Sequence, residues 1–131
     1  MVSTKGRYAL RVMLDLAANC DSAAVPLKDI AERQNVSKKY LEIIVKDLVK
    51  GGLIKGSSGK GGGYRLCKDV SDYNVGEILD VTENSLAYVA CLDKGAETCP
   101  RADGCKTLPM WQEIDSMVHE YLFNKKLTDL L

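Results

Sequence analysis

The sequence has little of the chemistry that enzymes rely on: it contains a single histidine, one tryptophan and one phenylalanine in 131 residues. Histidine is the side chain that most often exchanges protons near neutral pH. The sequence also shows no nucleophile motif and no pair of carboxylates placed for acid and base work. We therefore expect a binding protein and not an enzyme.

Long hydrophobic segments are missing as well. No apolar run approaches the roughly 18 residues that mark a membrane-spanning helix. A signal peptide does not fit the N-terminal segment, MVSTKGRYALRV, because this segment has no apolar centre and no small-residue cleavage site. These absences predict a cytoplasmic protein with no membrane partner, and the length corresponds to about one domain.

Net charge is also absent, since 18 Lys and Arg balance 18 Asp and Glu. The balance hides a division along the chain. Residues 1–66 carry twelve Lys and Arg against six Asp and Glu, and residues 67–131 carry six against twelve. A basic half beside an acidic half predicts that the first half binds a polyanion such as nucleic acid. Scattered surface charge without a partner is the alternative that composition leaves open.

Three amphipathic helices are predicted in the basic half, over residues 4–18, 26–34 and 37–50, because apolar residues recur there at helical spacing. Ser37 is a natural N-cap for the third helix, and Gly51 and Gly52 end it. The second and third helices are separated by a short turn. These are the proportions of a helix-turn-helix.

The third of these helices has two different faces. Its predicted buried face comprises Tyr40, Leu41, Ile44, Val45 and Leu48. Its predicted outward face comprises Ser37, Lys38, Lys39, Glu42, Ile43, Lys46 and Lys50. Positive charge near a helix N-terminus opposes the helix dipole, so an external anion such as phosphate should compensate for it.

A glycine-rich stretch follows, between two short runs of strand-forming residues, Leu53–Lys55 and Tyr64–Leu66. It matches neither of the phosphate-binding patterns GxxxxGK[ST] and GxGxxG. A β-hairpin wing next to the helix-turn-helix fits better, with a flexible linker as the alternative. The residues that we expect to contact DNA, from the third helix and this wing, are Ser37, Lys38, Lys39, Tyr40, Glu42, Lys46, Ser58, Lys60, Gly61 and Gly62.

Five cysteines are present, an odd number that argues against a disulfide scaffold. Cys20 and Cys67 are isolated and look structural. Cys91, Cys99 and Cys105 share one loop with C-x7-C-x5-C spacing. Three thiolates on one loop suit an iron–sulfur cluster, while zinc or another thiophilic metal, a metal-free thiol switch and no role are the alternatives. A fourth ligand is not evident, and Asp93, Glu97, Asp103, a partner residue or a small molecule could supply it.

A longer helix is predicted from about residue 108 to 123, with an apolar stripe that includes Trp111, Ile114, Val118 and Tyr121. A second copy of the chain is the simplest cover for such a stripe, and closure of the monomer's own core is the alternative. The sequence thus predicts a mainly α fold with a small β-hairpin: a winged helix-turn-helix plus a long C-terminal dimerisation helix. We divide it into a DNA-binding domain (1–68), a connecting helix with the cysteine-rich cluster-binding loop (69–107), and the dimerisation helix and tail (108–131).

Three stretches, STKGRYALRVMLDLA, LKDIAERQNVSKKYLEIIVKDLVKGGLI and GKGGGYRL, resemble the Rrf2 family of bacterial winged-helix regulators. The resemblance covers essentially the whole chain. It implies a homodimer that represses or activates transcription, with the third helix in the major groove and the wing at the minor groove of a pseudo-palindromic double-stranded DNA operator. For Cys91, Cys99 and Cys105 it implies a [2Fe-2S] or [4Fe-4S] cluster whose gain or loss changes DNA binding.

The sequence departs from the family at the fourth ligand. Some members carry a histidine three positions after the third cysteine, where this chain has Leu108. Others use an acid in the first helix, at the position of Arg7. The cluster type and the signal sensed, whether cluster supply, iron, redox state or nitric oxide, stay open. The alternative is a cluster-free regulator controlled by a protein or small molecule, as in family members without these cysteines. Brown protein after anaerobic purification would favour the cluster, which aerobic purification can remove.

Overall fold

The computed structural model describes residues 1–21 and 23–131. Helices make up most of it, and its only strands among these residues form one antiparallel hairpin. In chain order the elements are α1 (Thr4–Ala18), α2 (Leu27–Gln34), α3 (Lys38–Lys50), β1 (Ile54–Ser57), β2 (Gly63–Leu66), α4 (Val75–Thr82) and α5 (Leu108–Asn124). The predicted mainly α fold with a small hairpin is confirmed.

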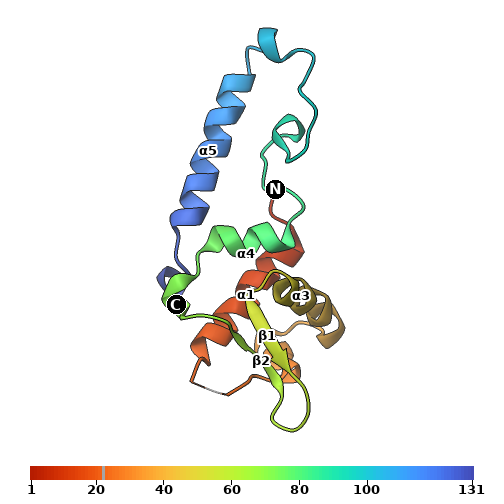
Figure 1. Cartoon of the computed structure of the whole chain (residues 1–131), viewed down its shortest axis with the longest axis vertical. Helices are drawn as coiled ribbons and strands as arrows, with labels where there is room; N and C mark the ends of the chain where they lie inside the picture. The colour runs from red at the N-terminus through yellow and green to blue at the C-terminus, as the bar shows by residue number, and fades with distance from the viewer. Residues whose placement is uncertain (22) are drawn as a thin grey trace.

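The molecule is elongated (Figure 1). A compact body contains α1 to α4 and the hairpin, and an arm made of α5 and the segment 83–107 extends from it. After α5 the chain returns to the body, where a short 3-10 turn (Leu127–Leu130) ends it. No helix in the two described ranges has the length and apolar character needed to cross a membrane.

Helix ends follow the capping residues of the sequence. The Ser3 hydroxyl accepts a hydrogen bond from the Gly6 amide at the start of α1, and the Ser37 hydroxyl accepts one from the Tyr40 amide at the start of α3. Each bond satisfies an N–H group that the helix itself leaves unpaired. After α3 it is Gly52, with φ of 76°, that takes the left-handed conformation, while Gly51 stays right-handed.

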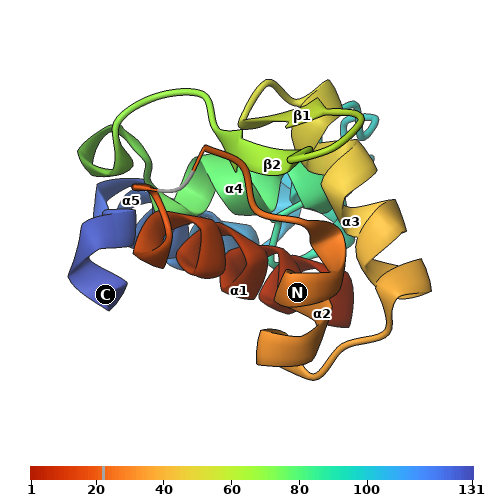
Figure 2. The same cartoon turned by 90° about the horizontal axis from the view of Figure 1, so that it is seen from below.

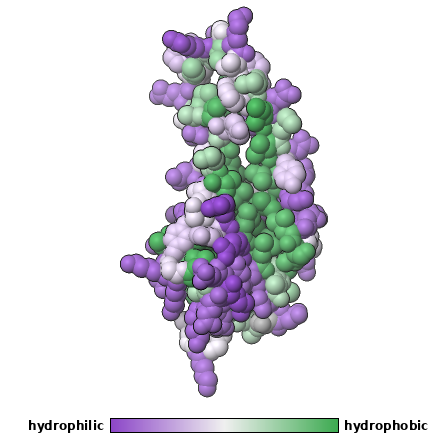
Figure 3. Space-filling view, turned by 180° about the vertical axis from the view of Figure 1, so that it is seen from behind, coloured by the Kyte–Doolittle hydropathy of each residue, from purple (hydrophilic) through white to green (hydrophobic). Residues whose placement is uncertain are grey.

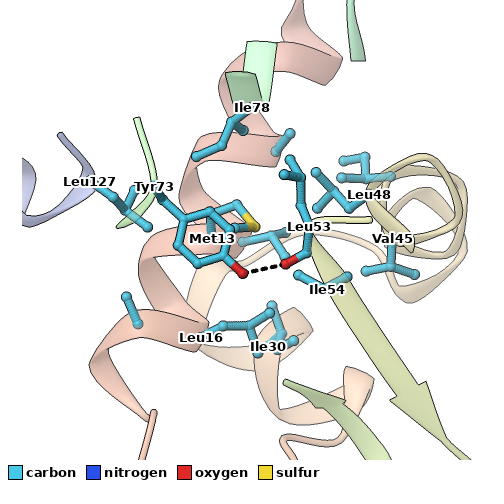
Figure 4. Close-up of a cluster of buried hydrophobic side chains, with 14 of the residues drawn as sticks. Met13, Leu16, Ile30, Val45, Leu48, Leu53, Ile54, Tyr73, Ile78 and Leu127 are labelled. Carbon is cyan, nitrogen blue, oxygen red and sulfur yellow. Dashed lines mark hydrogen bonds between the residues drawn. The ribbon is translucent and has the colours of Figure 1, made fainter. Parts of the chain in front are cut away.

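The core of the body surrounds α1, whose residues Met13 and Leu16 are almost fully buried (Figure 4). Tyr73 lies in this core with 1% of its surface exposed. Its hydroxyl donates a hydrogen bond to the Leu53 carbonyl at 2.6 Å and accepts one from the Cys67 amide at 2.9 Å. Burial raises the pKa of Tyr73, which keeps the hydroxyl able to donate. This one side chain therefore ties both ends of the hairpin to the core.

A buried carboxylate fixes α2 against α1. Asp15 is 5% exposed and accepts hydrogen bonds from Arg33 Nη2 at 2.8 Å, Arg33 Nε at 3.0 Å and Gln34 Nε2 at 3.0 Å. The hydrogen bond to Asp15 raises the pKa of Arg33 above its ordinary value. A buried charge is tolerated only when it is paired in this way. These hydrogen bonds therefore fix the position of α2 on α1.

The hairpin pairs Ile54 with Leu66 and Ser57 with Gly63 at its two ends. On the edge of β2 that faces away from β1, Val25 and Tyr64 form an antiparallel bridge and exchange backbone hydrogen bonds of 2.9 and 2.8 Å. Gly63 has φ of 151°, and a Cβ there would lie 2.3 Å from the Val25 carbonyl oxygen. Only glycine lets the wing approach the loop before α2 so closely.

The arm joins the body where α5 crosses α4. A Cβ on Gly76 would lie 2.3 Å from the Phe123 ring, so the two helices touch at this point. Beyond α5, the Leu127 amide donates to the Tyr73 carbonyl at 3.0 Å, and the Leu127 side chain is fully buried in the core. The C-terminal end of α5 is thus fixed to the body at two points, Phe123 and Leu127.

Tyr73→Phe tests the tie between the wing and the core. The substitution removes one oxygen and leaves the buried Leu53 carbonyl without its donor. We expect the free energy of unfolding to fall by about 1–3 kcal/mol in urea denaturation. Tyr88→Phe, on a side chain that is 58% exposed, is the matched control and should leave stability unchanged. Equal stability of the two variants would contradict the assignment.

Candidate nucleic-acid interface and cysteine loop

Helix α3 lies at the edge of the body beside the hairpin (Figure 2). Leu41, Ile44, Val45 and Leu48 are buried, as the sequence predicted. The opposite face is exposed and carries Ser37, Lys38, Lys39, Glu42, Ile43, Lys46 and Lys50. A helix with one buried face and one cationic exposed face can present that second face to a groove of DNA.

The lysines of this exposed face have no carboxylate partner in the described part of the chain, where four ion pairs occur and none includes a lysine of α3. Asp47, the other acid of α3, pairs with Lys5 Nζ at 2.7 Å. Glu42 is therefore the only acid of α3 whose charge is left without such a partner. The first turn contains no acid, so Lys38 and Lys39 face the positive end of the helix dipole unopposed.

Tyr40 differs from the other predicted contact residues because it is half-buried. Its ring meets the Tyr8 ring edge-on, with centroids 5.8 Å apart, and the Arg11 guanidinium lies 4.9 Å from the Tyr8 centroid. Tyr40 thus packs α3 onto α1, in line with the apolar spacing that placed it on the inner face.

The wing tip is exposed at Ser58, Lys60 and Gly61. Gly62 donates its amide to the Gly59 carbonyl at 3.0 Å and closes the turn. A Cβ on Gly62 would lie 2.5 Å from the Ser57 carbonyl oxygen, so the tip has no room for a side chain there. The tip is narrow and carries one positive charge.

Sequence reasoning left Lys55 out of the candidate interface. The strand register pairs Lys55 directly with Arg65, and both side chains are exposed. Like charges opposite each other destabilise a hairpin unless an anion lies near them. Only the register, which pairs β1 with β2 residue by residue, could have revealed this pair.

The three loop cysteines lie on the segment that joins α4 to α5. Cys91 is exposed in a 3-10 turn (Ala90–Leu92), and Cys99 and Cys105 are half-buried. Among the described residues, no three His, Cys, Asp or Glu side chains stand together as metal ligands. In the described part of the chain the three thiols therefore share one segment without forming a ready-made group of ligands.

Cys105 lies next to the N-terminus of α5. Its sulfur is 3.5 Å from the Thr107 hydroxyl, and hydrogen bonds from that hydroxyl and from the Thr107 and Leu108 amides lower the pKa of the thiol. Since the thiolate is the metal-binding form, the lowered pKa favours Cys105 as a ligand. Cys20 and Cys67 are exposed thiols and not the structural residues that their isolation suggested.

The cysteine loop contacts α5 and α4 at separate points. The Tyr88 amide donates to Asp115 on α5 at 3.1 Å, and the Tyr88 ring stacks on Trp111 with centroids 6.0 Å apart. Lys94 pairs with Asp80 on α4 at 3.2 Å. Asp93, one of the predicted fourth ligands, accepts a hydrogen bond from the Ser85 hydroxyl. The stretch around Cys91 is thus linked directly to α5 and α4.

Helix α5 exposes a hydrophobic band along the arm (Figure 3). All 17 of its residues are described and none is buried. Trp111 and Ile114 are half-buried, while Val118 is 36% exposed and Tyr121 62% exposed. Met110 and Met117 widen the band, with exposed fractions of 46% and 63%. His119 is exposed and stacks on Phe123, away from the cysteines in sequence.

Known proteins are similar to this chain in sequence and in fold. A protein-family model described as "Rrf2: Iron-dependent Transcriptional regulator" matches residues 2–131. The HTH-type transcriptional regulator IscR of Escherichia coli is 39% identical over 130 residues, which cover 99% of this chain and 79% of that protein.

Two solved structures have the same fold along nearly the whole chain. The global cysteine regulator CymR of B. subtilis has a TM-score of 0.80 at 34% identity, covering 99% of this chain and 95% of that one. IscR of T. potens has a TM-score of 0.75 at 33% identity, covering 99% and 85%. Both the winged helix-turn-helix fold and the predicted family are confirmed. The chain belongs to the Rrf2 family and is a DNA-binding transcriptional regulator, not an enzyme.

Proposed function

We propose that the protein is a homodimeric regulator whose affinity for a pseudo-palindromic operator depends on an iron–sulfur cluster bound by Cys91, Cys99 and Cys105. Residues 1–68 bind DNA, 69–107 connect and sense, and 108–131 form the dimer contact. The observation that carries the proposal is the place of the three thiols, on the one segment that runs from α4 to α5 and is fastened to both. The description of the matching family model as iron-dependent supports it.

DNA binding is assigned to the exposed face of α3 and to the wing tip. Lys38, Lys39, Lys46 and Lys60 are exposed and contact phosphates, which gives affinity with little sequence preference. Ser37 also caps α3, so its side chain positions the helix as it meets the backbone of the DNA. Ser58, Gly61 and Gly62 form a tip narrow enough to enter a minor groove. Tyr40 is half-buried and offers DNA only the exposed part of its side chain.

The dimer is assigned to the hydrophobic band of α5, with Trp111, Ile114, Val118 and Tyr121 at the contact. An exposed band of this kind on a small protein marks an interaction surface. A two-fold pair lets each copy cover the other with the same residues. It also presents two α3 helices to one side of a DNA duplex.

The donor set fits an iron–sulfur group, because three cysteine thiols share one loop and one of them has a lowered pKa. When bound, a cluster supplies a redox-active centre that joins the three thiolates. The chain itself provides the connection from this loop to the DNA-binding body. Tyr88 and Asp115 hold the loop to α5, Lys94 and Asp80 hold it to α4, and Phe123 packs on Gly76 where α5 meets the body. A change in the loop thereby alters how α5 sits on the body.

The function is tested by titrating operator DNA, selected from random duplexes, with anaerobically purified protein, demetallated protein and Cys99→Ala. We expect the first to differ from the other two by roughly 5- to 150-fold in affinity, the usual range of allosteric coupling. Cys67→Ala, an exposed thiol outside the loop, is the control and should behave as the first. Equal affinities for all forms would favour a cluster-free regulator under the control of another partner.

Met117→Lys tests the dimer. The side chain is 63% exposed, so the substitution leaves the fold intact and places a charge in the hydrophobic band. We expect light scattering at micromolar concentration to give twice the mass of the chain for the wild type and a single mass for the variant. Gln112→Lys adds the same charge at an exposed position a quarter-turn or more from the band and should stay dimeric. A monomeric wild type would refute the dimer.

Glu42→Ala tests base selection. A carboxylate on the exposed face of α3 can accept a hydrogen bond from cytosine N4 and repels phosphates. We expect the variant to lose its preference at one position of each half-site while affinity for the other bases there stays equal or rises. Lys39→Ala should instead weaken all sequences alike. A uniform loss of affinity in Glu42→Ala would make Glu42 a structural residue.

A further inference from the structure

One side chain on the exposed face of α3 is hydrophobic, whereas most of its neighbours on that face are charged. Ile43 is 51% exposed, the most exposed of the large hydrophobic side chains in that helix. Helical spacing places Lys39 four residues before it, Lys46 three residues after it and Lys50 seven residues after it, so lysines line the same stripe. The buried residues Leu41, Ile44 and Leu48 lie on the other side. Ile43 therefore occupies the middle of the cationic face.

Among the described residues, Ile43 belongs neither to the hydrophobic core nor to the side chains that pack against it. The core is filled from the opposite face of α3, and a β-branched side chain lowers helix propensity. Covering its exposed apolar surface with another molecule would lower the free energy. The flanking lysines decide the kind of molecule, because an apolar protein surface would have to desolvate them whereas a nucleic acid would pair them with phosphates.

We propose that Ile43 selects thymine in the operator by packing against its 5-methyl group. The inference rests on the proposed DNA-binding face. The thymine methyl is the one apolar group that the bases present in the major groove, and aliphatic side chains contact it. Cytosine at the same position offers an amino group, which Ile43 would desolvate without a hydrogen bond in return. Ile43 and Glu42 thus give α3 two adjacent readers of opposite character, one apolar and one acidic.

The test removes the methyl group alone. Each thymine of the selected operator is replaced in turn by deoxyuridine, and affinity is measured by fluorescence anisotropy for the wild-type protein and for Ile43→Ala. We expect the wild type to lose about fourfold in affinity at one position in each half-site, the factor that corresponds to one buried methyl group. Ile43→Ala should bind the thymine and deoxyuridine operators equally.

Val49→Ala is the matched control, since Val49 is a branched residue of α3 that is 42% exposed and lies off the lysine stripe. It should keep the wild-type response to deoxyuridine. If the wild type binds its operator specifically but responds to deoxyuridine at no position, or if Ile43→Ala keeps the response, the role of Ile43 is refuted and the DNA-binding face stands. If no duplex is bound specifically, both fail.

Discussion

The structure depends on one constraint: α5 presents a hydrophobic band that the described part of the chain covers only in part. The lower end of this helix is fixed to the body through Phe123 and Gly76 and through the return of Leu127 to the core. Its N-terminal end follows directly on the cysteine loop. In the proposed dimer, the partner's α5 covers the band and thereby sets the distance between the two bodies. The cysteine loop and the proposed DNA-binding faces are therefore connected through α5.

Polar contacts inside the body give the proposed DNA-binding face its shape. Asp15, paired with Arg33 and Gln34, holds α2 on α1, and α2 in turn leads into the turn before α3. Tyr73 holds the base of the hairpin. With these two ties α3 and the wing stand side by side, and the positive charge of the first half of the chain collects there although the chain as a whole is neutral.

Local signals in the sequence were enough to predict the helices and the hairpin. Ser37 begins α3, and the glycines after Lys50 end it, because caps depend on neighbouring residues alone. Contacts between distant parts of the chain were beyond such reasoning. The pairing of Lys55 with Arg65 depends on strand register, and the burial of Leu127 depends on how the chain returns after α5. The cysteine spacing identified the loop but could not show that Tyr88 and Asp115 fasten it to α5, since the loop has no periodicity to read.

Hydroxyl-radical footprinting of the operator tests the central claim most directly, because it maps every sugar that the protein covers. The account predicts two protected patches on one face of the duplex, related by the two-fold axis of the site and separated by about 34–36 Å or a multiple of it. Each patch should include a minor-groove segment covered by the wing. A single patch, or two patches without two-fold symmetry, would contradict a dimer that presents two α3 helices to one operator.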